Sequence, residues 1–289
     1  MSDYQIITDA TADLSAEWAD RIGVAVIPMD VELDGSPYLF GPGGDITGSE
    51  FFTAMRQGKL GSTSQISPAR YEAAFERYLS QGLDILYICF SSGLSGTIQA
   101  ARICMDELRE RYPERKLLCV DSLSASAGEG FLVTGAAEQK QAGLDIEALA
   151  AWVEANRLHV CHWFTVEDLK FLHRGGRVSA ATAVVGSALQ IKPVMHCDKE
   201  GHLTNTGKVR GRKHSLLALL DHADQSWTPG RGRKVFICHG DCLADAQFMA
   251  QEFQRRRPEA EITLFHMGPI IGAHCGPGVI AIFTWGTQR

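Results

Sequence analysis

The stretch Phe-Ser-Ser-Gly-Leu-Ser-Gly-Thr-Ile-Gln at residues 90–99 combines three serines with two glycines. Hydroxyls such as those of Ser92 and Ser95 donate and accept hydrogen bonds, and a glycine such as Gly96 lets the backbone approach a ligand closely. An apolar run over 85–90 precedes this loop and helix-spaced apolar residues follow it, which predicts a strand-to-helix turn. Because a helix start attracts anions, the loop is either a seat for a phosphate or carboxylate group or an ordinary capped turn.

A second polar turn, Thr-Ser-Gln at residues 63–65, stands one residue before Ser67 and Pro68. Serine caps helices and proline suits their first position, so a helix is predicted to begin here. Thr63 and Ser64 then lie just outside the helix. Their hydroxyls either satisfy the turn itself or face a ligand beside it.

Two later stretches carry groups that suit an anion. His274 is the only histidine or charged residue between Gly268 and Gly278, where glycines and prolines constrain the backbone. Arg174 and Arg177 flank a Gly-Gly turn and form a local positive charge. The alternatives are a structural histidine and a helix C-cap with basic residues at the negative end of the helix dipole.

Other charged residues have simpler interpretations. Lys208, Arg210, Arg212 and Lys213 are expected to open a helix as an exposed basic face, either idle or docking an acidic partner. Asp13 is expected to cap the first helix of the chain.

Strands and helices alternate through the first half of the chain. Strands are predicted at 4–9, 24–33 with an interruption at Pro28, 85–90 and 115–121, which indicates a mainly parallel sheet with helices on both faces.

The second half changes character. It contains a predicted hairpin of 191–196 with 202–207, a small-residue helix at 179–190 and further strand–helix alternation. We therefore predict two α/β domains: residues 1–157, with the parallel sheet flanked by helices, and residues 158–289, a smaller domain with a mixed sheet.

Composition excludes several classes of protein. The 289 residues are 45% hydrophobic and 21% charged, as in an ordinary globular chain, and the net charge of −6 argues against generic nucleic-acid binding. No run approaches the roughly 20 apolar residues that cross a bilayer, so at most transient membrane contact is expected. The start, MSDYQIITD, lacks a signal-peptide pattern and the eight cysteines are scattered, which favours the cytoplasm. Cys238, His239 and Cys242 have no second ligand pair at zinc-finger spacing, so no metal is predicted.

Taken in order, these motifs resemble those of the DegV family, along essentially the whole chain. The matching stretches are Asp-Ala-Thr-Ala-Asp-Leu at 9–14, Thr-Ser-Gln-Ile-Ser-Pro at 63–68, Ser-Ser-Gly-Leu-Ser-Gly-Thr at 91–97, Asp-Leu at 168–169 with Arg-Gly-Gly-Arg at 174–177, Ile-Lys-Pro at 191–193, Lys-Val-Arg-Gly at 208–211 and Gly-Ala-His-Cys-Gly-Pro-Gly at 272–278.

The resemblance implies a two-domain α/β protein of the DegV type that holds a long-chain fatty acid between its domains and is not itself an enzyme. Some members of the family are the fatty-acid-binding subunit of a bacterial fatty acid kinase and present the carboxyl group to a separate kinase protein. By the same resemblance, Thr63 and Ser95 hold the carboxylate and His274 closes from the second domain. Arg177 and Arg210 become candidates for phosphate handling or kinase docking. No cofactor is implied.

The sequence departs from the family pattern at three positions beside the expected head-group site: Ala10 replaces a common serine, Ile66 a proline and Cys275 a threonine. The physics suits a lipid, because hydroxyls and a helix N-terminus bind a carboxylate and a nearby imidazolium of His274 would strengthen those bonds. Burying each CH₂ is worth roughly 0.8 kcal/mol, so a sixteen-carbon chain gains about 10 kcal/mol before ordering costs.

Two other functions are weighed against lipid binding. A serine hydrolase or transferase for a small anionic substrate needs Ser95 as nucleophile and His274 as base, but no Gly-x-Ser-x-Gly elbow and no obvious acid to orient the histidine are present. A nucleic-acid regulator using the Arg210–Lys213 cluster is opposed by the net charge.

Overall fold

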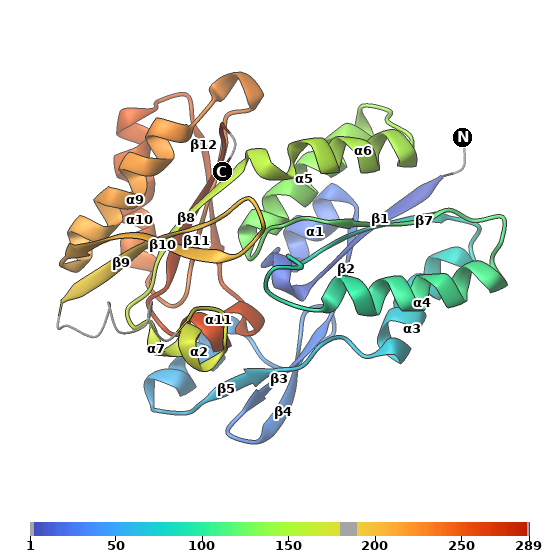
Figure 1. Ribbon diagram of the computed structural model, residues 1–289, viewed down its shortest axis with the longest axis horizontal. Helices are drawn as coiled ribbons and strands as arrows, with labels where there is room; N and C mark the ends of the chain where they lie inside the picture. Colours follow the sequence, from blue (N-terminus) through green and yellow to red (C-terminus); the bar gives the residue numbers. More distant parts are fainter. Residues whose placement is uncertain (1–2, 180–189, 288) are drawn as a thin grey trace.

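The computed structural model describes residues 3–179, 190–287 and 289. The strands are β1 (Tyr4–Asp9), β2 (Val24–Ile27), β3 (Met29–Leu33), β4 (Ser36–Phe40), β5 (Gly61–Thr63), β6 (Asp84–Cys89), β7 (Leu117–Asp121), β8 (Val160–Thr165), β9 (Ile191–Cys197), β10 (Leu203–Arg210), β11 (Lys234–His239), β12 (Glu261–His266) and β13 (Ile280–Trp285). The helices are α1 (Ala16–Ile22), α2 (Gly48–Arg56), α3 (Pro68–Leu79), α4 (Thr97–Arg111), α5 (Ala127–Gln141), α6 (Ile146–Asn156), α7 (Lys170–Arg174), α9 (Arg212–Ser226), α10 (Leu243–Arg256) and α11 (Pro269–Cys275). Figure 1 shows them arranged around two larger sheets and a small one.

The first larger sheet is entirely parallel, in the order β2-β1-β6-β7. Every residue of β6 is buried, as expected for a central strand covered on both faces. Helices α3 and α4 lie on one side of this sheet and α1 and α6 on the other (Figure 1). The predicted parallel sheet flanked by helices is confirmed.

The second larger sheet is mixed, in the order β10-β9-β8-β13-β11-β12, and only its β11–β12 pair is parallel. Helices α9 and α10 cover its outer face, while α5 packs against β8, β11 and β13 from the other side. The predicted hairpin is present as β9 and β10, although β10 extends to Arg210 instead of ending at residue 207. The predicted helix at 179–190 falls on residues that, apart from its two ends, lie outside those described.

A third, three-stranded sheet in the order β4-β3-β5 was missed by the sequence interpretation. Pro28 does interrupt the predicted strand 24–33, but the two parts join different sheets: β2 pairs with β1, and β3 pairs with β4 and β5. Helix α11 packs on β3 and β5. The small sheet therefore brings a segment of the first half against the segment that carries His274.

One apolar core joins the halves of the molecule. Phe131 on α5 lies with its ring centroid 4.9 Å from that of Phe236 on β11 and 5.0 Å from that of Trp285 on β13, both edge to face. The strands of the parallel sheet all precede residue 157 and those of the mixed sheet all follow it. A domain boundary at 157 stays a prediction. Within the described ranges, none of the helices has the length and apolarity required to traverse a bilayer.

Candidate functional site

A cavity of about 310 Å³ opens where the small sheet, the start of α4, α11 and the mixed sheet meet. One side is polar and is formed by Thr63, Ser64, Gln65, Ser95, Gly96, Thr97, Arg177 and His274. The rest is mainly apolar, with aromatic and aliphatic side chains such as Phe164 on β8, Phe283 on β13 and Ile270 on α11. Such a combination suits a ligand with a polar head and a long apolar body.

Thr63 and His274 are the centre of the polar side. Thr63 ends β5, α11 carries His274 against that strand, and Oγ1 of Thr63 lies 2.8 Å from Nε2 of the histidine. Burial, together with the positive charges of Arg177 and Arg174, lowers the pKa of His274 to about 4. The imidazole is therefore neutral at neutral pH, with one donor and one acceptor nitrogen. The sequence analysis expected a charged imidazolium at His274, and this expectation is wrong for the free protein.

Ser95 stands one residue before the N-cap of α4. The N-cap of this helix is Gly96, which offers no side-chain cap, and Ser95 supplies the nearby hydroxyl. Oγ of Ser95 is 2.8 Å from Oγ1 of Thr97 and accepts a hydrogen bond from the Thr97 N–H at 3.3 Å. A Cβ on Gly96 would lie 2.9 Å from Nε2 of Gln65, so the glycine lets the two polar turns meet. Helix start and hydroxyl thus face the cavity together.

Arg177 adds a positive charge to the same side. It is half-buried, burial lowers its pKa, and its Nη1 donates a hydrogen bond to the carbonyl oxygen of Gly175. Among the described residues no carboxylate lies within ion-pair distance of Arg177. A partly desolvated guanidinium without a counter-charge favours binding of an anion.

The predicted site residues are brought together with one exception. Thr63, Ser64, Ser95, Gly96, Arg177 and His274 all line the cavity, whereas Ser92 does not. Ser92 is exposed and its backbone N–H donates to Oδ1 of Asp121 at 3.2 Å. Ser92 belongs to the same loop as Ser95, but its hydroxyl does not line the cavity.

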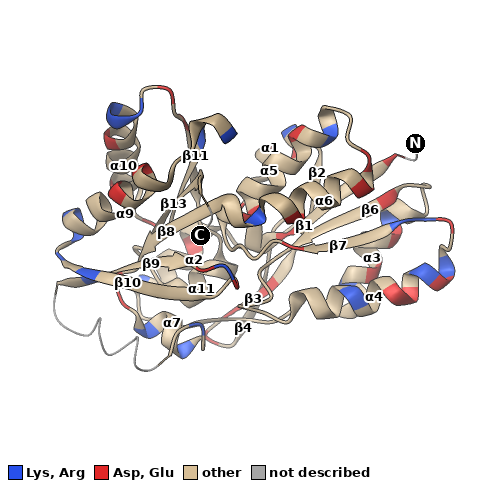
Figure 2. Cartoon of the chain, turned by 45° about the horizontal axis from the view of Figure 1, so that its top comes forward, with Lys and Arg blue, Asp and Glu red and all other residues tan. Residues whose placement is uncertain are grey.

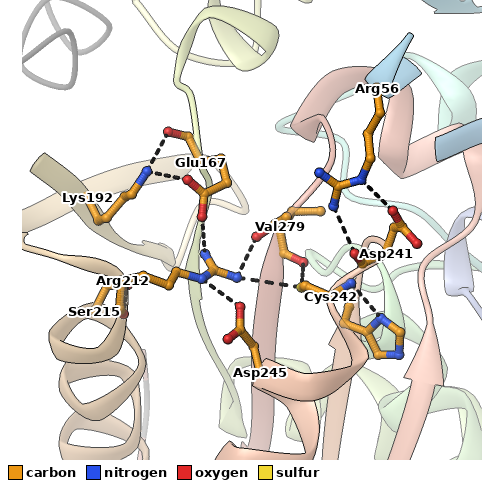
Figure 3. Close-up of polar contacts among 11 residues, drawn as sticks. Arg56, Glu167, Lys192, Arg212, Ser215, Asp241, Cys242, Asp245 and Val279 are labelled. Atoms are coloured by element: carbon orange, nitrogen blue, oxygen red, sulfur yellow. Dashed lines mark hydrogen bonds and ion pairs between the residues drawn. The ribbon is translucent and has the colours of Figure 1, made fainter. Parts of the chain in front are cut away.

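The expected basic face is divided by the structure. Lys208 and Arg210 end β10 and are exposed, as is Lys213. Arg212, the first residue of α9, instead points inward (Figure 3). It does so because several oxygen acceptors converge on its guanidinium.

The oxygen atoms around Arg212 come from three different segments, two of them as hydrogen-bond acceptors and that of Glu167 as an ion-pair partner. Its Nε lies 2.8 Å from Oδ2 of Asp245, its Nη1 3.3 Å from Oε1 of Glu167, and its Nη2 donates to the carbonyl oxygen of Gly278 at 2.7 Å (Figure 3). Gly278 belongs to the loop that follows α11, the helix that carries His274, so the hydrogen bond from Arg212 holds that loop in place.

The sequence analysis did not predict that Asp13 is a buried acid with partners far along the chain. Asp13 does not cap α1, since Ser15 does; its carboxylate instead accepts hydrogen bonds from Ser126 Oγ at 2.5 Å and the Gly268 N–H at 2.8 Å. Burial raises the pKa of Asp13 to about 7. Asp13 thereby links the first half of the chain to the segment that begins α11, a contact that no local pattern reveals.

The sequence analysis also did not predict that residues of β8 line the cavity. On β8, His162 and Phe164 face the cavity, while Trp163 between them stacks with His222 of α9. This period of two is visible in the sequence, but it marks any buried strand face and not a ligand wall.

The geometry does not assemble a serine nucleophile. Ser95 pairs with Thr97 and His274 with Thr63. A Cβ on Gly175 would lie 2.4 Å from Nδ1 of His274, so a backbone segment, and not a carboxylate, stands beside that nitrogen. Nor does the described part of the chain contain a cluster of three or more His, Cys, Asp or Glu side chains that could hold a metal ion.

Comparisons with known proteins agree on one family. The family model described as "Uncharacterised protein, DegV family" matches residues 3–286. A DegV domain-containing protein of Clostridium perfringens is 36% identical over 289 residues, covering 100% of this chain and 99% of the relative. A solved structure described as fatty acid binding of a DegV family protein from Thermus thermophilus is 30% identical, with a TM-score of 0.87 over 99% of this chain and 100% of that one. The structure of DegV, described as a fatty acid binding protein from Bacillus subtilis, is 26% identical, with a TM-score of 0.85 over 98% and 99% of the two chains.

Proposed function

This chain belongs to the DegV family, and from that premise we propose that it binds a long-chain fatty acid in the cavity where the small sheet, the start of α4, α11 and the mixed sheet meet. The observation that carries the proposal is the junction of Thr63 with His274, beside Ser95 and the start of α4, at the polar side of an otherwise apolar cavity. The fatty acid binding named for the Thermus thermophilus and Bacillus subtilis proteins supports it.

In this proposal the polar side holds the carboxylate. The hydroxyls of Thr63 and Ser95 and the first N–H groups of α4 donate hydrogen bonds to its two oxygens. Neutral His274 donates through Nε2 once the ligand replaces Thr63 as its partner, and the charge of Arg177 compensates the carboxylate. An anion at this position would raise the pKa of His274 from its value of about 4 in the free protein.

The acyl chain occupies the apolar remainder of the cavity. Phe164, Ile270 and Phe283 belong to the buried core of the protein and also line the cavity. The acyl chain therefore fills empty space and contacts these core side chains. Burial of a sixteen-carbon chain supplies about 10 kcal/mol at roughly 0.8 kcal/mol per CH₂, before ordering costs. This apolar contribution exceeds the hydrogen bonds in size, while the hydrogen bonds set the orientation.

The proposal includes presentation of the carboxyl group to a separate kinase for acyl-phosphate formation. Ser64 and Gln65 are exposed, so the head group lies near the surface. Figure 2 shows basic residues on β10, at the start of α9 and around α7. The exposed members Lys208, Arg210 and Lys213 suit docking of an acidic surface. Reversing the charge of Arg210 in the loaded protein and following acyl phosphate in an extract of the source cells tests this part separately.

Ligand binding is tested first on the protein as purified. Native mass spectrometry followed by organic extraction should release a free long-chain fatty acid, and the delipidated protein should take up hexadecanoic acid saturably. An empty protein that also ignores the added acid would contradict the proposal.

Replacement of Thr63 and Ser95 by alanine together should weaken hexadecanoic acid binding without unfolding the protein. Loss of two hydrogen bonds to a charged group costs on the order of 3 kcal/mol, or about a hundredfold in Kd. Ser92→Ala is the matched control, since that serine lies in the same loop but does not line the cavity. Equal affinity of the double variant and the control would place the head group elsewhere.

A further inference from the structure

Two segments that contribute to the polar side of the cavity lie against each other at three points. At each point a glycine has no room for a side chain, because a Cβ would come within 2.4 Å of an atom of the other segment. The three pairs are Gly175 with Nδ1 of His274, Gly276 with Cδ2 of Phe171, and Gly278 with Cγ of Glu167. Positions 167, 171 and 175 are four apart, the spacing of one helix face. Helix α7 and its flanking residues therefore pack along the end of α11 as one unit.

Helix α7 connects this packing to the head-group site. Leu172 of α7 lines the cavity, and its carbonyl oxygen accepts a hydrogen bond from the backbone N–H of Arg177 at 2.9 Å. Arg177 lines the cavity as well, and its charge contributes to the low pKa of His274. A displacement of α7 would therefore move the charge of Arg177 and the backbone beside His274 together.

The beginning of this unit is held by Glu167, three residues before α7. Its two carboxylate oxygens face cations from two other elements (Figure 3). Oε2 pairs with Nζ of Lys192 on β9, and the same Nζ donates to the main-chain carbonyl oxygen of Glu167 at 3.2 Å. Oε1 lies 3.3 Å from Nη1 of Arg212 at the start of α9. Both the side chain and the backbone of Glu167 are thus fixed.

Arg212 joins Glu167 to the segment on which α7 packs. Its Nη2 donates to the carbonyl oxygen of Gly278, the glycine that lies against Glu167. Its Nη1 is buried and makes no hydrogen bond within the described part of the chain, so its polar contact is the ion pair with Glu167. Asp245, the other carboxylate paired with Arg212, lies on α10 and approaches Nε instead.

The ion pairs of Glu167 are not a strong source of stability. Its side chain is 42% exposed, and pairs that water reaches contribute little to the free energy of folding. The geometry points to a different role, since one side chain contacts two cations and also the segment that carries His274.

We propose that Glu167 is a positioning residue for carboxylate binding. Its pairs with Lys192 and Arg212 set the place of α7, and α7 in turn places Arg177 and the backbone that orients His274. The inference rests on the proposed function, because it concerns the same head group.

The test compares Glu167→Gln with Asp245→Asn in the delipidated full-length protein. Each substitution removes one carboxylate charge beside Arg212 and keeps the size of the side chain, but only Glu167 lies at the start of the α7 unit. Glu167→Gln should weaken hexadecanoic acid binding about fivefold in titration calorimetry. Asp245→Asn should leave the affinity unchanged, while both variants lower the thermal midpoint to a similar extent.

A second readout follows α7 in the free protein. The pKa of His274, about 4, depends on burial and on the charges of Arg177 and Arg174. A shift of α7 in Glu167→Gln should therefore raise it in an NMR titration of the ring, and Asp245→Asn should not. In a His274→Ala background, Glu167→Gln should weaken binding by a smaller factor, because part of its effect passes through the missing ring.

Equal affinities and equal pKa values of His274 in the two carboxylate variants would overturn the inference and leave Glu167 a role in stability alone. Failure of the unaltered protein to bind hexadecanoic acid would overturn the proposed function, whereas the pKa of His274 would still decide whether Glu167 places α7. If Glu167→Gln does not fold, Lys192→Gln breaks the same contact from the other side. It should produce the same weakening and the same rise in pKa, and unchanged values would overturn the inference.

Discussion

Gly175 offers the sharpest test of the proposed head-group site, because it lies beside His274 but does not line the cavity. Its φ of −71° is available to any residue, so alanine introduces no backbone strain there. The added Cβ would lie 2.4 Å from Nδ1 of His274, where ordinary contact begins at 3.4 Å. The imidazole must therefore move by about 1 Å.

That displacement acts on a single hydrogen bond. The ring cannot shift by about 1 Å and keep the 2.8 Å distance from Nε2 to Oγ1 of Thr63 or to a carboxylate that replaces it. Loss of one such bond to a charged group costs about 1.5–2 kcal/mol, so Gly175→Ala should weaken hexadecanoic acid binding by roughly ten- to thirtyfold.

Titration calorimetry on the delipidated protein measures the effect. Gly207→Ala is the matched control, since a Cβ there meets nothing within 4 Å. In a His274→Ala background, Gly175→Ala should add nothing further, because the group it displaces is gone. A folded Gly175→Ala protein with unchanged affinity, or an additive double variant, would refute the assigned role of His274.

Two further predictions concern stability. Because the folded pKa of Asp13 is raised to about 7, its proton stays bound after the unfolded chain has lost it; this contribution is complete below about pH 4 and disappears as the pH rises through about 7. Asp13→Asn should accordingly flatten the fall in the free energy of unfolding, measured by urea denaturation, by about 2.7 kcal/mol between pH 5 and 8, and an unchanged slope would show that Asp13 does not titrate in this range. Arg212→Ala should destabilise the protein by about 2 kcal/mol through loss of the Asp245 and Gly278 contacts, while exposed Lys213→Ala should stay within about 0.5 kcal/mol; equal thermal shifts for the two variants would contradict the inward orientation of Arg212.

Local patterns predicted the elements whose signals are complete within a few residues. Ser67 with Pro68 marks the start of α3, and Ser67 does cap it by accepting a hydrogen bond from the Arg70 N–H. The apolar run before the serine loop is the fully buried strand β6. Capping and burial patterns of this kind depend on neighbours in the sequence, so the sequence suffices to identify them.

Short elements stabilised by distant partners were not predictable in this way. Strand β5 has three residues and α11 has seven, too few for a periodic signal. Each exists because it packs against the other. Arg212 was misinterpreted for the same reason, since its three oxygen partners lie 33 or more positions away along the chain.

The sequence by itself determined which chemical groups this protein can use: serine and threonine hydroxyls at two turns, a histidine framed by glycines, and the motifs of its family. Only the tertiary structure decided how they act. It paired Thr63 with His274 across 211 positions of the chain and kept Ser92 out of the cavity lining. The protonation state of His274 likewise depends on burial and on the charges of Arg177 and Arg174. These properties arise from distances and desolvation, which exist only after distant segments have packed together.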